Sequence, residues 1–242
     1  MEQNKNNFSM RLLVLICAPK PANKAAKLFH QGAIPVQYKL NGEGTASSEI
    51  MDMLGLGSSD KSILISTLPK QFADIMLLKL RRALGLGKKN TGIAFTIPIS
   101  GASGSILRML HQLHEKSNSN LRKDEINLTD NKYSLIAAII NRGYSGEVMD
   151  VARAAGARGG TIVNSRRIGT EEAASFWGLN VLDEKEILLI LSTNEGKKKI
   201  MTEISEKCGI NSDANGLVIS MPVDNVIGLG NMDLEDDYDI DL

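Results

Sequence analysis

The residues best suited to chemistry lie in a short loop with the sequence GLGKKNTG, at positions 85–92. Its glycines would let backbone N–H groups turn inward as an anion-binding nest, and two adjacent lysines would add positive charge. The loop therefore predicts a site for a phosphate or carboxylate group. The alternative is a glycine that ends a helix, followed by a solvated turn. The candidate ligand residues are Gly85, Gly87, Lys88, Lys89, Asn90, Thr91 and Gly92.

A second basic segment, ARGGTIVNSRRIGT, covers residues 157–170. Three arginines in a glycine-containing stretch suit bidentate contacts with carboxylate or phosphate oxygens. We expect the second and third of them to lie in a loop after a short strand. A solvated basic turn is the alternative. The candidate ligand residues are Arg158, Gly159, Gly160, Arg166, Arg167, Gly169 and Thr170.

The chain matches itself when it is shifted by 124 residues, so both segments belong to an internal repeat. The matched positions include Gly32 with Gly156, Ile63 with Ile187, Gly85 with Gly209, Gly92 with Gly216, and Pro98 with Pro222. The second copy of the loop, residues 208–216, has Asp213 and no lysine. We expect this copy to hold phosphate less well, with Asn215 and Gly216 as its candidate ligands.

The repeats span residues 8–104 and 133–229, and each is long enough to form a domain with a modest core of its own. Residues 105–132 lie between them. Leucine and isoleucine at helical spacing predict a helix over 105–115, and a polar linker follows. Residues 230–242 form an acidic tail that we expect to be disordered.

Both repeats show the same order of hydrophobic patterns, strand-helix-strand-strand-helix-strand, which is the ferredoxin-like plan. The predicted fold class is α+β, with two tandem ferredoxin-like domains. One face of each sheet would carry two helices, and the other must be covered by oligomerisation or by the other repeat. The first repeat has predicted strands at 12–17, 34–40, 62–67 and 91–97, a helix at 20–31 ended by Gly32, and a helix capped by Thr67 and Pro69. The second has predicted strands at 135–140, 161–164, 187–191 and 217–221, and helices at 147–155 and 197–208.

The formal net charge is zero, from 28 basic and 28 acidic residues, but six of the acids lie in the tail. The rest of the chain therefore carries a charge of +6, which favours a small anionic partner. Ten aromatic residues are few for a protein that stacks nucleic-acid bases. No apolar run reaches the length of a membrane span and no secretory signal is evident, so we expect a cytoplasmic protein.

Cysteine and histidine give no further site. Cys17 and Cys208 sit beside apolar residues and are expected to be core residues rather than redox or metal ligands. His111 and His114 have the spacing of a metal pair on a helix, but no third ligand cluster is visible. We therefore predict no metal site.

Several of these segments resemble the P-II nitrogen-regulatory protein family, in particular its branch with a short loop. They are ARGGTI at 157–162, Gly169-Thr170, EKEILLIL at 184–191, NGLVISMPVDNVIGL at 215–229 and TGIAFTIPI at 91–99. The resemblance covers both repeats. It implies trimers with clefts between neighbouring domains, in which an adenine nucleotide is sensed, sometimes with 2-oxoglutarate. Loops 85–92 and 208–216 would help to hold the phosphates, and loops 41–60 and 165–184 would contact target proteins.

The sequence therefore predicts a non-catalytic signalling protein of nitrogen regulation. A small anionic effector, with ATP, ADP or AMP first, would bind where loop 85–92 faces the arginine segment. Through its loops the protein would control an unknown partner protein. The predicted assembly is a trimer of tandem chains, a pseudo-hexamer. The alternative is a small acylphosphatase-like hydrolase that uses Arg158 with Asn164 or Asn211. Nucleic-acid binding ranks third, because the strands at 62–67 and 187–191 have no aromatic residues.

Overall fold

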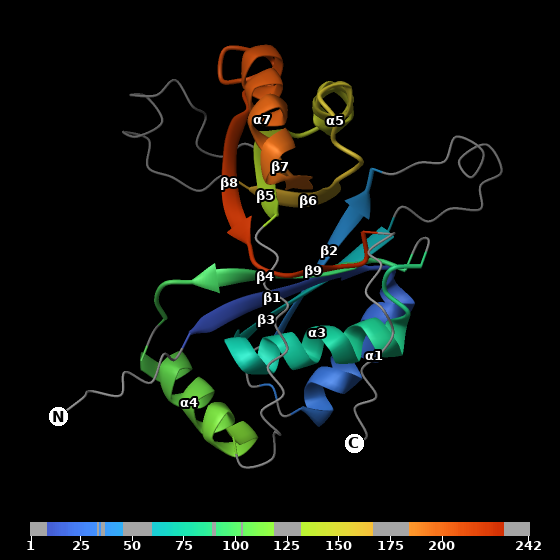
Figure 1. Cartoon of the computed structure of the whole chain (residues 1–242). Coiled ribbons are helices and arrows are strands. Elements are labelled where there is room, and N and C mark those ends of the chain that lie inside the picture. The colour runs from blue at the N-terminus through green and yellow to red at the C-terminus, as the bar shows by residue number, and fades with distance from the viewer. Residues whose placement is uncertain are drawn as a thin grey trace.

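The computed structural model describes residues 9–32, 34, 37–45, 60–88, 91–102, 104–118, 132–166 and 184–229. These residues form five helices and nine strands, arranged as a lower and an upper half joined in the middle (Figure 1). No helix within these ranges is long and apolar enough to cross a membrane. The acidic tail and most of the polar linker lie outside the described residues.

The lower half in Figure 1 is the first repeat. Its strands are antiparallel and occur in the order β2-β3-β1-β4, with both helices on one face, as the ferredoxin-like plan predicts. Its elements are β1 (Met10–Cys17), α1 (Pro19–Gln31), β2 (Gln37–Gly44), β3 (Asp60–Pro69), α3 (Lys70–Leu84) and β4 (Ile93–Ile99).

The upper half is the second repeat, and it has the same strand order, β6-β7-β5-β8. The helix predicted between the repeats is present as α4 (Gly104–Asn118) and packs near β3. The elements of the upper half are β5 (Tyr133–Asn141), α5 (Ser145–Ala154), β6 (Thr161–Arg166), β7 (Glu184–Thr193), α7 (Asn194–Cys208) and β8 (Leu217–Val223).

Three local predictions differ from the structure. The predicted half-buried strand 34–40 is instead β2, which begins at Gln37 and is mostly exposed. Helix α3 begins after Pro69 without a side-chain cap, so Thr67 stays in β3 and does not cap the helix. Arg166 ends strand β6 instead of lying in a loop. For β2 and β6, the same pattern of alternating residues fits a strand on either side of the predicted boundary.

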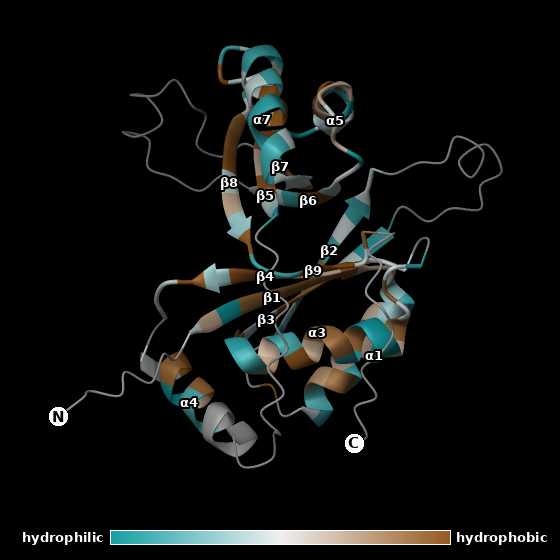
Figure 2. Ribbon diagram, in the orientation of Figure 1, coloured by the Kyte–Doolittle hydropathy of each residue, from teal (hydrophilic) through white to brown (hydrophobic). Residues whose placement is uncertain are grey.

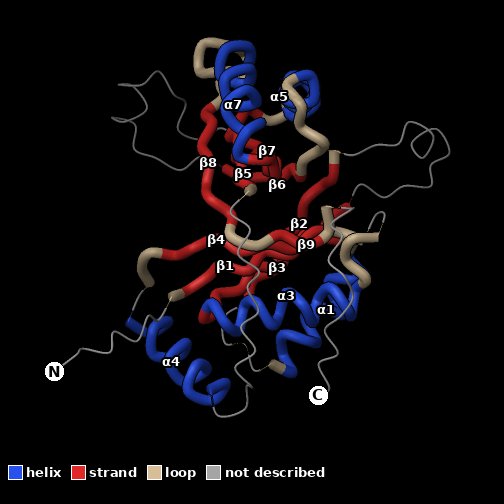
Figure 3. The backbone as a smooth tube through the Cα atoms, viewed as in Figure 1, coloured by secondary structure: helices blue, strands red, loops and turns tan. Residues whose placement is uncertain are grey.

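A short strand that the sequence did not predict, β9 (Val226–Ile227), follows β8 and joins the second repeat to the first. It pairs with β4, with Ala94 opposite Ile227 and Phe95 opposite Val226. At another point the end of β2 pairs with β6, where Glu43 aligns with Ile162. The two halves are therefore one antiparallel sheet of nine strands in the order β8-β5-β7-β6-β2-β3-β1-β4-β9 (Figure 3).

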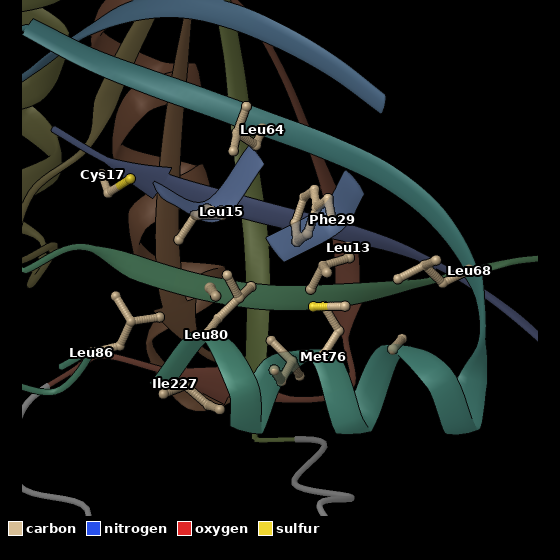
Figure 4. Packing of buried hydrophobic residues seen from close by; sticks show 14 of the residues in the cluster. Leu13, Leu15, Cys17, Phe29, Leu64, Leu68, Met76, Leu80, Leu86 and Ile227 are labelled. Carbon is tan, nitrogen blue, oxygen red and sulfur yellow. The ribbon is translucent and has the colours of Figure 1, made fainter. Parts of the chain in front are cut away.

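Each half has its own core between its sheet and its helices. In the first half, Phe29 of α1 and Leu80 of α3 are buried against Leu13 and Leu15 of β1 (Figure 4). In the second, Val148 of α5 and Ile204 of α7 cover the corresponding face. Alternation of side chains along β1 places Leu13, Leu15 and Cys17 toward the helices. The alternate residues of the strands must be buried elsewhere.

A third core lies between the two sheet faces that carry no helices. Val14, Ile16 and Phe95 from the first half meet Leu135 and Val223 from the second, and we call this cluster the inter-repeat core. Figure 2 shows hydrophobic residues along β1 and β4 where the halves approach each other. Of the two predicted ways to cover these faces, the structure shows repeat-on-repeat packing. The trimer and its pseudo-hexameric form stay predictions.

The inter-repeat core predicts that the halves unfold together. Phe95 is fully buried in it, so Phe95→Ala should lower the free energy of unfolding by about 3–5 kcal/mol through lost burial and a cavity. Urea unfolding followed by circular dichroism should still show a single transition. Tyr38→Ala removes an exposed aromatic ring and serves as the control. Two transitions, only one of them shifted by Phe95→Ala, would contradict a shared core.

Candidate functional site

Three glycines with positive φ angles set the backbone conformation of the loop after α3. Gly85 ends the helix with φ +66°, and Gly87 and Gly92 have φ +107° and +109°. These conformations are unfavourable for residues with a Cβ. Between the first two glycines, Leu86 is buried in the helix-side core and anchors the loop. The result is an anchored loop with an exposed Lys88, whose side-chain carbons lie beside Gly85.

Among the described residues of this loop, four backbone N–H groups already donate hydrogen bonds. The N–H groups of Gly85 and Leu86 donate to Arg81 O, and that of Lys88 donates to Gly85 O. The N–H and hydroxyl of Thr91 both donate to Lys88 O. The described residues therefore do not present the row of inward N–H groups expected of a nest. Within the described residues, the positive charge of this loop comes from the Lys88 side chain. Lys89 and Asn90 lie outside the described residues.

The loop ends at a direct contact between the two halves. A Cβ at Gly228, which follows β9, would lie 2.3 Å from the carbonyl oxygen of Gly92. A Cβ at Gly92 would in turn lie 2.5 Å from the carbonyl oxygen of Ile16. Ile227, next to Gly228, is buried in the same core as Leu86 (Figure 4). Loop 85–92 is thus seated on the second repeat at the junction of the halves.

The second copy of the loop is closed on itself. A Cβ at Gly216 would lie 2.2 Å from Cys208 O, and the Gly216 N–H donates to that oxygen. Asn215 adopts φ +45°, and its side-chain amide donates to Ile210 O. The Asn141 side chain also binds this loop, through Asp213 O. These bonds explain the glycines by close packing, and the weaker phosphate binding expected of this copy stays a prediction.

The arginine segment is held by the first repeat. The Thr45 hydroxyl accepts a hydrogen bond from Gly160 N at 2.7 Å and donates to Gly160 O at 3.1 Å. Thr45 N also donates to Gly160 O, and Arg153 donates to Thr45 O. A Cβ at Gly160 would lie 2.8 Å from Leu188, so glycine is required for this packing. Arg158 is exposed and lies two residues before Gly160, which makes these hydrogen bonds.

The two basic segments are not adjacent along the sheet. Gly92 precedes β4 and Gly160 precedes β6, and in the sheet β2, β3 and β1 lie between these strands. At about 4.8 Å a step, four steps separate them by about 19 Å along the sheet. The predicted pairing of loop 85–92 with the arginine segment therefore stays a prediction. Arg167, Gly169 and Thr170 lie outside the described residues, as do residues 46–59 of the predicted loop 41–60 and residues 167–183 of the predicted loop 165–184.

Two lysines lie between these segments, near the ends of β2 and β3. The Lys39 side chain donates to Asn23 of α1, and Lys61 packs where Gly44 has no side chain. Burial raises the pKa of the Cys17 thiol to about 11, against the opposing effect of both lysines. Cys17 and Cys208 are buried and free, as predicted for core residues.

A buried polar cluster ties the β8–β9 turn to the first repeat. Asn225 is buried, and its amide donates to the Asp74 carboxylate of α3 at 2.7 Å. Asp74 also pairs with Lys70 at 3.2 Å, and the neighbouring Asp224 pairs with Arg11 of β1. Burial raises the pKa of Asp74, and Lys70 opposes this shift. The cluster therefore joins the junction to the helix that leads into loop 85–92.

The sequence predictions did not identify Thr45, Asp74 or Asn225. The signal for Asn225 was present, because the Asp-Asn pair interrupts an apolar run in SMPVDNVIGL. Among the described residues there is no group of metal-ligating side chains, and His111 is exposed. Asn164 lies three residues inside β6 and Asn211 in the loop after α7, so neither is held beside Arg158 by a described contact.

Comparisons with known proteins add a structural likeness. No protein-family model matches the chain, and no curated protein matches it. Solved structures do match, among them the crystal structure of Arabidopsis thaliana PII bound to citrate. The identity is 18% and the TM-score 0.31, with 39% of this chain and 78% of that chain covered. Because this likeness is weak, the functional interpretation depends on the residues of the chain.

The buried cluster predicts a pH-dependent stability. A carboxyl whose pKa is raised in the folded state stabilises the fold below its ordinary pKa of 3.8, and this contribution is lost as the pH rises through the raised value. Asp74→Asn keeps an acceptor for Asn225 without the charge. The stability of the wild type relative to this variant should therefore decrease as the pH rises from acid to neutral. Urea unfolding over that range measures it.

Asp150→Asn removes the same charge from an exposed carboxylate and is the matched control. Asp74→Ala removes the acceptor as well, and should cost about 1–3 kcal/mol because the buried Asn225 amide loses its partner. A wild type that gains stability relative to Asp74→Asn as the pH rises would contradict a raised pKa of Asp74.

The glycine contact can be tested with two substitutions that share one backbone conformation. Gly228 and Gly87 have φ +108° and +107°, but only Gly228 has backbone atoms within 3 Å of a built Cβ. Each change to Ala should cost about 1–3 kcal/mol of strain. Gly228→Ala should cost more than Gly87→Ala because the Gly92 carbonyl must move. Equal losses in thermal unfolding would show that the contact is not tight.

Proposed function

We propose that the chain is a P-II-like regulatory protein, a tandem duplication that binds a small anionic effector at loop 85–92. The observation that carries this proposal is the position of the exposed Lys88. It extends from an anchored loop whose last glycine contacts Gly228 of the second repeat. A ligand held there would contact the junction between the halves, as the resemblance to the family implies.

An anion is the ligand class favoured by the charges. Lys88 and Arg158 are exposed, and within the described ranges neither side chain has an ion-pair or hydrogen-bond partner. Arg142 and Arg153, by contrast, are paired with Glu184 and Asp150. An unpaired cation loses no existing partner when it binds a phosphate or carboxylate. Because most loop N–H groups are bonded internally, side-chain cations would supply most of the attraction.

The effector would act by shifting a population between two arrangements of the junction. Loop 85–92 continues from α3, and Asp74 of α3 holds Asn225 of the second repeat. A ligand that moves the loop would therefore alter contacts with the β8–β9 turn. At the other seam, Thr45 fixes the base of the segment 46–59 to the second repeat. In our proposal, a partner protein reads the resulting change at such segments.

Among anions, an adenine nucleotide is proposed first, on the resemblance of the chain to the P-II family. The protein acts in this proposal as a sensor and carries out no reaction. It is placed in the cytoplasm, where such effectors occur. Citrate and 2-oxoglutarate are the carboxylates to compare with ATP, ADP and AMP in the same measurements.

Isothermal titration calorimetry on the full chain tests the proposal. Lys88→Ala should weaken effector binding by about tenfold or more, since a charge-assisted contact contributes about 1.5–3 kcal/mol. Arg158→Ala tests whether both basic segments bind the same ligand. It should weaken binding only if Arg158 and Lys88 contact one ligand.

Lys198→Ala on α7 removes the same charge from an exposed helix position and is the matched control. The control should bind like the wild type. Absence of binding to the whole panel, or equal binding by Lys88→Ala and the wild type, would overturn the proposal.

A further inference from the structure

Two strands hold equivalent positions in the repeats but have different neighbours. β4 is the last strand of the first β-α-β-β-α-β unit, and β8 is the last strand of the second. The outer edge of β4 is covered by β9, which comes from the second repeat. β8 ends the sheet, and within the described ranges no strand lies beyond it.

The free edge of β8 lacks the usual protection against pairing. Its sequence, LVISMPV, contains no charged residue, and Pro222 stands near one end. Monomeric proteins usually protect such edges with charges, proline or short strands, because unpaired N–H and C=O groups accept another strand. Strand β2, which pairs with β6 only at its end, carries Lys39 and Glu43. Residues 217–221 are therefore an unprotected edge.

The side chains of this edge extend the inter-repeat core. Met221 packs against that core and aligns with the buried Leu135 of β5. Side chains alternate along a strand, so Leu217 and Ile219 share the face of Met221. Leu217 is 39% exposed and Ile219 is 50% exposed. The core between the repeats thus continues into an exposed apolar strip.

We propose that β8 pairs antiparallel with β8 of a second copy of this chain, about a two-fold axis at Ile219. An isologous contact requires a self-complementary patch. Centring on Ile219 places Leu217 opposite the partner's Met221, so apolar side chains meet on one face. The two nine-stranded sheets would join into one, and the apolar strip would extend across both copies.

A second copy fits this edge better than a charged partner segment does. The strip offers no charge for a basic or acidic peptide to recognise, and no like charges meet when it pairs with itself. In this contact the edge of β8 would be covered by a strand of another repeat, as the edge of β4 is covered by β9. This inference does not depend on the proposed effector.

Light scattering after size-exclusion chromatography tests the proposal on the full chain. The wild type should have twice the chain mass of 26.2 kDa at micromolar concentration. Ile219→Lys should raise the dissociation constant by about tenfold or more, because two lysines would meet at the axis. Ile210→Lys makes the same change at a loop residue that is 41% exposed and should leave the dimer intact.

A cross-link keeps the proposal testable if Ile219→Lys fails to fold. Directly opposite positions of an antiparallel pair have Cβ atoms about 4.5–5.5 Å apart, near the range that a disulfide spans. Ile219→Cys should therefore form a disulfide-linked dimer on oxidation, whereas Ile210→Cys should not. Both native cysteines are buried. A single chain mass at every concentration, three chain masses, or no cross-link at Ile219→Cys would overturn the proposal.

Discussion

A ferredoxin-like sheet has one face covered by helices and one without cover, and the mutual burial of the two uncovered faces is the interaction on which this structure depends. Phe95 and Val14 from one half meet Leu135 and Val223 from the other. Because both helix-side cores involve only one sheet face, neither half can bury its alternate strand residues alone. The two repeats are consequently parts of one sheet and one cooperative unit, although each has the element order of a domain.

The junction works because glycine and buried polar groups let backbones approach where side chains would collide. Gly228 contacts Gly92, and a Cβ at Gly42 would lie 2.7 Å from Ile162 O. Thr45 and Asn225 then supply directional hydrogen bonds at the two seams. Hydrophobic burial provides most of the stabilisation, whereas these bonds fix the register, since an unmade buried hydrogen bond is costly. Loop 85–92 is held at one of these seams, where Gly92 contacts Gly228 of the second repeat.

The charge of Lys88, and not the backbone of loop 85–92, supports the proposed binding of an anion. Four of the described N–H groups of the loop donate to backbone carbonyl oxygens, so a preformed anion nest is not present in the described residues. Lys88 remains exposed at the junction. In loop 208–216, the matching glycines allow close packing around Gly216, and the loop contains no lysine. The matching glycines of the two loops are therefore explained by backbone packing. Only the first loop also carries an exposed lysine, Lys88.

The sequence by itself determined the β-α-β-β-α-β order of each half, the buried strands and the helix end at Gly85, because these depend on local periodicity and on backbone preferences of glycine. It also indicated that the bare sheet faces need a cover, but not which cover. Only the tertiary structure decided that the repeats cover each other, that β9 crosses to β4, and that Thr45, Asp74 and Asn225 join the halves. The physical reason is that these contacts connect residues far apart in the chain, as Asp74 and Asn225 are, at a separation of 151 positions. Their free energy depends on the packing of whole sheets, which no local pattern encodes.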